Sequence, residues 1–136
     1  MGVDPRFPKL AQHLVTSPPS DEYNCIAFAC GYDDRWMWPG RYWPPGFRSN
    51  ATVSVFKMVL ATYGYDQCAD GGLEQGMEKL ALYAVGEQVK HAARQLTSGR
   101  WTSKMGPNHD IEHPDVYSLE GPEYGKVVMF LRRKRR

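Results

Sequence analysis

The hydrophobic pattern of the chain changes near Gly72, and this change limits the folds that the sequence can adopt. Before it, residues 53–63 carry apolar side chains at helical spacing, and Gly64 stops that pattern. After it, residues 79–85 are apolar at nearly every position, which is typical of a central strand covered on both faces. Helices therefore precede strands along the chain, which indicates an α+β domain.

Three later segments are also expected to be strands. Residues 89–96 and 100–105 flank a Thr-Ser-Gly turn at 97–99, which predicts a hairpin, and residues 126–131 form a last apolar run. We expect the N-terminal helices to pack on an antiparallel sheet of about four to five strands. The 136 residues are enough for one such domain with its own core.

Both ends of the chain are expected to lie outside this domain, which then spans residues 21–131. Residues 1–20 resemble an N-terminal arm with a short helix near residues 10–15, because the SPPS sequence that follows breaks a helix. Residues 132–136, RRKRR, indicate a solvated basic tail. Since the net charge is only +2, we do not expect a nucleic-acid partner.

The cysteines and the apolar segments indicate in which cellular compartment the protein is expected. Cys25, Cys30 and Cys68 have no regular spacing, which argues against a disulfide framework. The first ten residues lack the apolar core of a signal peptide. No apolar stretch approaches the roughly 20 residues that a membrane span needs. We therefore expect a cytoplasmic protein without a membrane span, although export by a signal-free route would leave no trace in the sequence.

Cys25 is the cysteine best placed for nucleophilic chemistry. It stands in the first turn of a short apolar segment that predicts a buried helix ending at Gly31. A helix N-terminus lowers a thiol pKa and offers free N–H donors to an oxyanion. Cys30 stands at the other end of the helix, where the dipole disfavours a thiolate, and Cys68 lies in a loop. The alternative for Cys25 is a small buried apolar residue.

Two stretches resemble the papain-like cysteine hydrolases. Residues 24–29, NCIAFA, are similar to the nucleophile helix of that superfamily. Residues 80–106, with the sequences HAARQL and GRWTSKMG, look like the His strand and the following strand of its NlpC/P60 and CHAP branches, as in related bacterial sequences. The resemblance implies an NlpC/P60-like fold without a cofactor. It also implies that Cys25 attacks an amide or ester carbonyl, with His91 as the general base.

The third catalytic group is where the chain departs from these families. Asp110 is our first candidate, because a carboxylate orients an imidazolium better than a hydroxyl does. Ser103 is the second candidate and His113 the third. The alternatives are that Asp110 caps a turn and that Ser103 bonds the backbone across the hairpin.

The turn between the two hairpin strands decides which side chains share a face with His91. A three-residue loop with Gly99 in the left-handed conformation makes Leu96 pair with Arg100. Ser103 then lies on the same face as His91 and diagonal to it. A two-residue turn would shift the register by one residue and move Ser103 to the other face.

Further residues are expected to form the oxyanion and substrate sites: Tyr23, Asn24, Trp38, Trp43 and Lys104. Asn24 has the alternative role of a helix cap. The Trp-rich segment has the alternative of a hydrophobic cluster beneath a long loop. Lys104, if it faces the cleft, could bind an acidic group of the substrate, and its alternative is a solvated position beside a turn.

A zinc site is the first rival interpretation. His109 and His113 have H-x3-H spacing, and Cys25 and Cys30 are the nearest thiol pair in sequence. Zinc needs four converging ligands, and Pro114 directly after His113 argues against placing the histidine pair on a helix. We therefore expect no metal site.

The sequence favours an enzyme, a cysteine peptidase or amidase that cleaves an amide bond in a peptide, protein or peptidoglycan-like substrate. The alternative is a non-catalytic module of the same fold, an adaptor or immunity-type protein that binds a protein partner. Such a module would retain the aromatic segment but would not need a reactive thiol.

Overall fold

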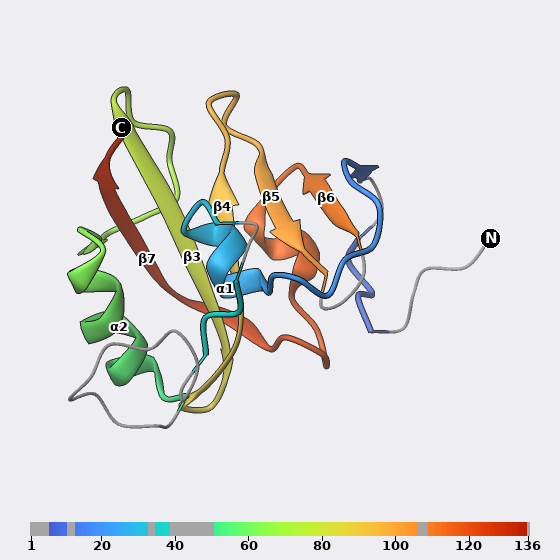
Figure 1. Ribbon diagram of the computed structural model, residues 1–136, viewed down its shortest axis with the longest axis horizontal. Helices are drawn as coiled ribbons and strands as arrows, with labels where there is room; N and C mark the ends of the chain where they lie inside the picture. The colour runs from blue at the N-terminus through green and yellow to red at the C-terminus, as the bar shows by residue number, and fades with distance from the viewer. Residues whose placement is uncertain (1–5, 11–12, 33–34, 39–50, 106–108, 136) are drawn as a thin grey trace.

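One antiparallel sheet of seven strands organises the computed structural model, which describes residues 6–10, 13–32, 35–38, 51–105 and 109–135. The strand order is β1-β6-β5-β4-β3-β7-β2 (Figure 1). The strands are β1 (Leu14–Val15), β2 (Asp66–Cys68), β3 (Met77–Val85), β4 (Gln88–Gln95), β5 (Trp101–Lys104), β6 (Asp110–His113) and β7 (Lys126–Lys134). The helical elements are α1 (Cys25–Ala29), α2 (Val53–Thr62) and the 3-10 helix η1 (Val116–Leu119).

The expected fold class is wrong, because the described chain is β-rich rather than an NlpC/P60-like assembly of helices on a four- to five-stranded sheet. α2 has ten residues, whereas α1 has only five. The additional strands are β1, β2 and β6, which have two, three and four residues. Segments so short carry little pattern of their own, and pairing with their neighbours decides their conformation.

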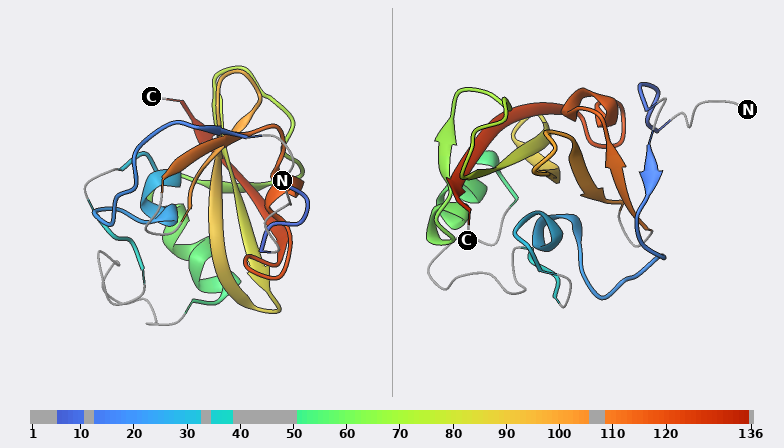
Figure 2. Two further views of the ribbon diagram at one scale, coloured as in Figure 1. Left: turned by 90° about the vertical axis from the view of Figure 1, so that its right-hand side faces the viewer. Right: turned by 90° about the horizontal axis from the view of Figure 1, so that it is seen from above.

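The sheet is covered on both sides, with α1 on one side and η1 on the other (Figures 1 and 2). Leu80 and Leu82 of β3 face a first core cluster that contains residues of α1 and α2. Ala81 and Tyr83 face a second cluster that contains residues of η1. This alternation explains why β3 is apolar at almost every position.

The hairpin between β4 and β5 has the three-residue loop, which is one of the two turns that the sequence left open. The Leu96 N–H donates to the Arg100 carbonyl at 2.7 Å. Gly99 has φ +91°, the left-handed conformation that glycine adopts without strain. Ser103 therefore shares a sheet face with His91, as the register of this loop requires.

The basic residues at the C-terminal end belong to the sheet, since β7 extends to Lys134. The Arg133 guanidinium forms an ion pair with Glu78 of β3. It also donates to the carbonyls of Tyr63, at 2.9 Å, and Cys30, at 3.4 Å. Those carbonyls lie at the C-terminal ends of α2 and α1, where a cation complements the helix dipole. The region assigned to a solvated tail thus includes a residue that joins both helices to the sheet.

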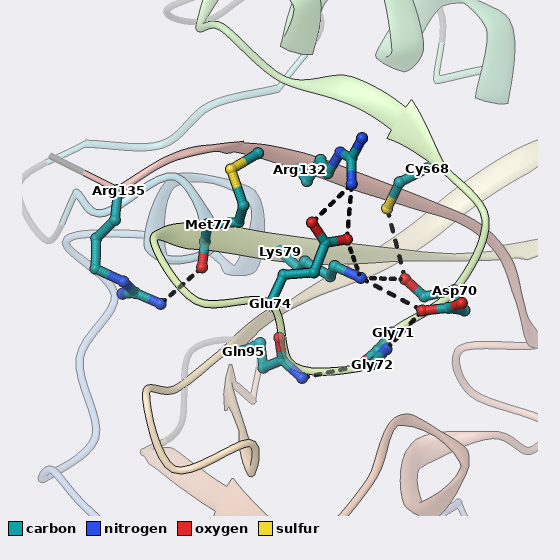
Figure 3. A network of polar contacts seen from close by, with 10 residues as sticks. All are labelled: Cys68, Asp70, Gly71, Gly72, Glu74, Met77, Lys79, Gln95, Arg132 and Arg135. Carbon is teal, nitrogen blue, oxygen red and sulfur yellow. Dashed lines mark hydrogen bonds and ion pairs between the residues drawn. The ribbon is translucent and has the colours of Figure 1, made fainter.

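A second polar network holds the loop between β2 and β3 against the sheet (Figure 3). Lys79, whose side chain is 1% exposed, donates to the Asp70 carbonyl at 2.9 Å and forms ion pairs with Asp70 and Glu74. Glu74 in turn accepts two hydrogen bonds from Arg132, both at 2.7 Å. The buried ammonium of Lys79 is therefore compensated by two carboxylates from one loop.

Within the described residues, no helix is long and apolar enough to cross a membrane.

Replacing Arg133 with Gln should lower the free energy of unfolding by about 2 to 3 kcal/mol, because it leaves the Glu78 carboxylate buried without its partner. The side chains of Arg133 and Glu78 are only 11% and 13% exposed. Urea denaturation measures the effect. The matched control is Arg132→Gln, whose side chain is 43% exposed and whose loss should change stability little. Equal losses in the two variants would contradict the role assigned to Arg133.

Candidate active site around Cys25

α1 begins at Cys25, and the side chain of Asn24 fixes this end of the helix. The Asn24 Oδ1 accepts hydrogen bonds from the backbone N–H of Ala27, at 3.1 Å, and of Met37, at 3.0 Å. Its Nδ2 donates to the Met37 carbonyl at 2.9 Å. Asn24 is therefore the helix cap, which is the alternative that the sequence left open, and its amide is engaged by the backbone.

The Cys25 thiol lies where β4 and β5 separate. The paired residues of these strands are Gln95 with Trp101 and Arg94 with Thr102. Alternate N–H groups of a strand point to the same neighbour, so the Ala92 N–H points toward the β5 side, as that of Arg94 does. Ala92 is instead a backbone hydrogen-bond partner of the Cys25 thiol. In a continuous β4–β5 ladder this N–H group would donate a hydrogen bond to β5. Here its partner is the Cys25 sulfur.

Burial dominates the acidity of this thiol and raises the pKa of Cys25 to about 11. Backbone N–H groups of Ala92, Ile26 and Cys25 itself act in the opposite direction, and so does the charge of Lys104. Part of Cys25 remains exposed to solvent. The thiol is therefore protonated at neutral pH, and it needs a base before it can act as a nucleophile.

Lys104 lies near this thiol on the α1 side of the sheet, and Asp110 lies beside Lys104. They are opposite each other in the β5–β6 register, and they are 0% and 6% exposed. The Tyr23 hydroxyl donates to Asp110 Oδ2 at 2.7 Å, and Lys104 Nζ is 5.0 Å from the centroid of the Tyr23 ring. Asp110 Oδ1 has no hydrogen-bond partner among the described residues. A buried carboxylate with a free lone pair favours a cation or a donor nearby.

Burial and the charges around Lys104 act on its pKa in opposite directions. Burial lowers the pKa of the Lys104 ammonium, whereas Asp110, Cys25 and Asp21 act to raise it, in that order. Burial has the larger effect, so the Lys104 ammonium loses its proton more readily than that of a solvated lysine. The sequence alone did not group Lys104 with Asp110, because the grouping depends on the unpredicted strand β6.

His91 faces the other side of the sheet. Its ring stacks on Tyr124, with centroids 4.0 Å apart and planes 4° apart, and meets Tyr83 edge-on at 5.2 Å. Both tyrosines belong to the second core cluster, whereas Cys25 packs against the first. Neither ring nitrogen of His91 has a hydrogen-bond partner in the part of the chain that the structure describes. The structure therefore does not bring His91 and Cys25 together as a hydrogen-bonded pair.

Ser103 and His113 form a separate pair on the same side as His91. The Ser103 Oγ is 2.8 Å from His113 Nε2, and His113 Nδ1 is 2.8 Å from the Asp115 carbonyl. Because a carbonyl only accepts, Nδ1 carries the proton and Nε2 accepts from the serine hydroxyl. Both side chains are fully buried. The structure thus pairs Ser103 with His113 rather than with His91, and Asp110 with Tyr23.

The remaining predicted residues add little to the site. Trp38 packs edge-on against Phe56 of α2, with ring centroids 5.5 Å apart, and contributes to the first core cluster. Trp43 lies outside the described residues. In the described ranges no group of three or more His, Cys, Asp and Glu side chains could hold a metal ion.

The chain belongs to the DUF7689 family, a domain of unknown function, whose model matches residues 14–132. The match begins with β1 and extends into β7, so it includes the entire candidate site. No curated protein and no solved structure matches the chain significantly. The description of the family names no activity, so a function has to be argued from the side chains.

Stability should fall as the pH is lowered from 7 to 5. Burial, together with the charge of His113, holds the pKa of His91 well below its ordinary value of 6.5. The unfolded imidazole therefore takes up a proton below pH 6.5 while the folded one stays neutral, which costs up to about 1.4 kcal/mol per pH unit. His91→Phe keeps the ring stack, so urea denaturation of this variant should show a shallower decline. An unchanged decline would contradict the neutral, unpaired state of His91.

Proposed function

We propose that the protein is a cysteine-dependent hydrolase, a peptidase or amidase, whose nucleophile is Cys25. The observation that carries this proposal is the set of groups around the sulfur. Backbone N–H groups from α1 and from Ala92 of β4, together with the Lys104 ammonium, all favour the thiolate over the thiol. A purely structural cysteine needs none of these donors.

The reaction proposed for this site is acyl transfer to sulfur. The thiolate attacks the carbonyl carbon of an amide, the C–N bond breaks, and the amine leaves with a proton. Water then hydrolyses the thioester, which releases the carboxylic acid and restores the thiol. The substrate class that we propose is a peptide, a protein or a peptidoglycan-like polymer, each of which supplies amide bonds.

Replacing Cys25 with Ala should abolish hydrolysis, with a loss of at least about 100-fold in kcat/KM, because alanine has no thiol to form the acyl-enzyme. The measurement is product formation from a fluorogenic peptide library and from purified peptidoglycan, with mass spectrometry of the trapped acyl-enzyme. Cys30→Ala and Cys68→Ala are the matched controls, and both should retain turnover. Activity that survives in Cys25→Ala would exclude Cys25 as the nucleophile.

A non-catalytic binding module is the second candidate function, and the protonated thiol favours it. Burial raises the pKa of Cys25 to about 11, and His91 does not contact it as a base. Iodoacetamide labelling separates the candidates. A hydrolase should be labelled at Cys25 faster than at Cys30 or Cys68, whereas a binding module should show equal, slow labelling and no turnover.

A further inference from the structure

The described chain has two fully buried lysines, and their surroundings differ. Lys79 is held by two carboxylates and a carbonyl of one loop, which together compensate its buried side chain (Figure 3). Lys104 lies near the Cys25 thiol and near two carboxylates, Asp21 and Asp110, and Asp110 Oδ1 has no hydrogen-bond partner in the described residues. Lys79 is therefore engaged in ion pairs with its own loop, whereas Lys104 lies beside a nucleophilic group.

We propose that Lys104 is the general base that deprotonates Cys25, a role that the sequence resemblance gave to His91. This inference rests on the proposed function of Cys25 as a nucleophile. The thiol and the amine are neighbours because of the sheet register and because β4 and β5 separate beyond Arg94 and Thr102.

The register places Lys104 beside the sulfur. Continuing the pairing of Gln95 with Trp101 and of Arg94 with Thr102 would set Lys104 opposite Ala92. Ala92 is a backbone hydrogen-bond partner of the Cys25 thiol, so the sulfur lies near this position of β4. The Lys104 side chain lies on the α1 side, where its ammonium is over the Tyr23 ring.

The other candidate bases are engaged elsewhere. His91 and His113 belong to the opposite side of the sheet, with His91 stacked on Tyr124. Asp110 accepts the Tyr23 hydroxyl.

The charged and titratable groups that face Lys104 come from every element packed around it. The segment before α1 contributes Asp21 and Tyr23, α1 contributes Cys25, and β6 contributes Asp110. β4 contributes Arg94, whose guanidinium lies over Phe28 at 5.0 Å and cannot act as a base. Burial of Lys104 outweighs the two carboxylates, so the neutral amine that a base requires is favoured relative to a solvated lysine.

Every proton that moves in the proposed reaction has a donor and an acceptor. The neutral Lys104 amine takes the proton of the Cys25 thiol, and the thiolate attacks the amide carbonyl. When the C–N bond breaks, the Lys104 ammonium returns that proton to the leaving amine. In the second half of the cycle the amine takes a proton from the attacking water and returns it to the departing thiolate.

The test compares Lys104→Arg and Lys104→Met with the wild type. Arginine keeps the charge but cannot deprotonate, so kcat should fall at least about 100-fold in both variants. Labelling of Cys25 by iodoacetamide at pH 8 should fall at least tenfold in Lys104→Met but persist in Lys104→Arg, because there the cation still favours the thiolate. Cys68 is the internal labelling control, and Lys90→Met, at an exposed position of β4, is the control for turnover.

The results separate the two proposals. Full turnover in Lys104→Arg, with turnover lost in Cys25→Ala, overturns the role of Lys104 and leaves the cysteine hydrolase standing. Loss in His91→Phe without loss in Lys104→Arg assigns the base to His91 and likewise overturns this inference. Turnover that survives Cys25→Ala, or no hydrolysis by the wild type, overturns both. Where Lys104→Met does not fold, Lys104→Arg alone decides, with circular dichroism as the check on folding.

Discussion

The central parts of β3 and β4 are buried on both faces, and the alternation of their side chains determines the chemical surroundings of the residues there. Adjacent residues of β4, His91 and Ala92, face different core clusters although their backbones are continuous. The first face contains α1 and the thiol, and the second contains a ring stack and a Ser–His pair. Neighbouring residues of a strand point to opposite faces, so a polar side chain one position further along the chain lies in the other of the two environments.

α1 has five residues, too few for a helix that is stable on its own, so its position depends on the groups at its two ends. Asn24 holds the first turn through hydrogen bonds to Ala27 and Met37. Arg133 binds the carbonyl at the other end and belongs to β7, at the far end of the sequence. The cysteine is therefore positioned by side chains that are more than a hundred residues apart in sequence.

Local signals in the sequence were sufficient for some of these features. The helical spacing of residues 53–63 and the turn before Arg100 predict α2 and the hairpin, because both depend on neighbouring residues alone, whereas two registers of that hairpin stayed open. The fold class failed because β1, β2 and β6 are short and form only by pairing with distant strands. The basic segment suggested a tail, since nothing local shows that Glu78 would lie opposite Arg133. Tertiary packing also determines which face of the sheet α1 covers. The separation of His91 from Cys25 therefore could not be derived from the spacing of residues in the sequence.

The hydrogen bond from Ala92 to the thiol makes one amide of the sheet a spectroscopic reporter of the chemistry at Cys25. A thiolate accepts a hydrogen bond more strongly than a thiol does, and a thioester sulfur accepts it more weakly. The amide proton resonance of Ala92 should therefore move in one direction when the cysteine ionises and in the other under the acylation that we propose. The backbone of β4 would then register each state of the sulfur without a probe attached to it.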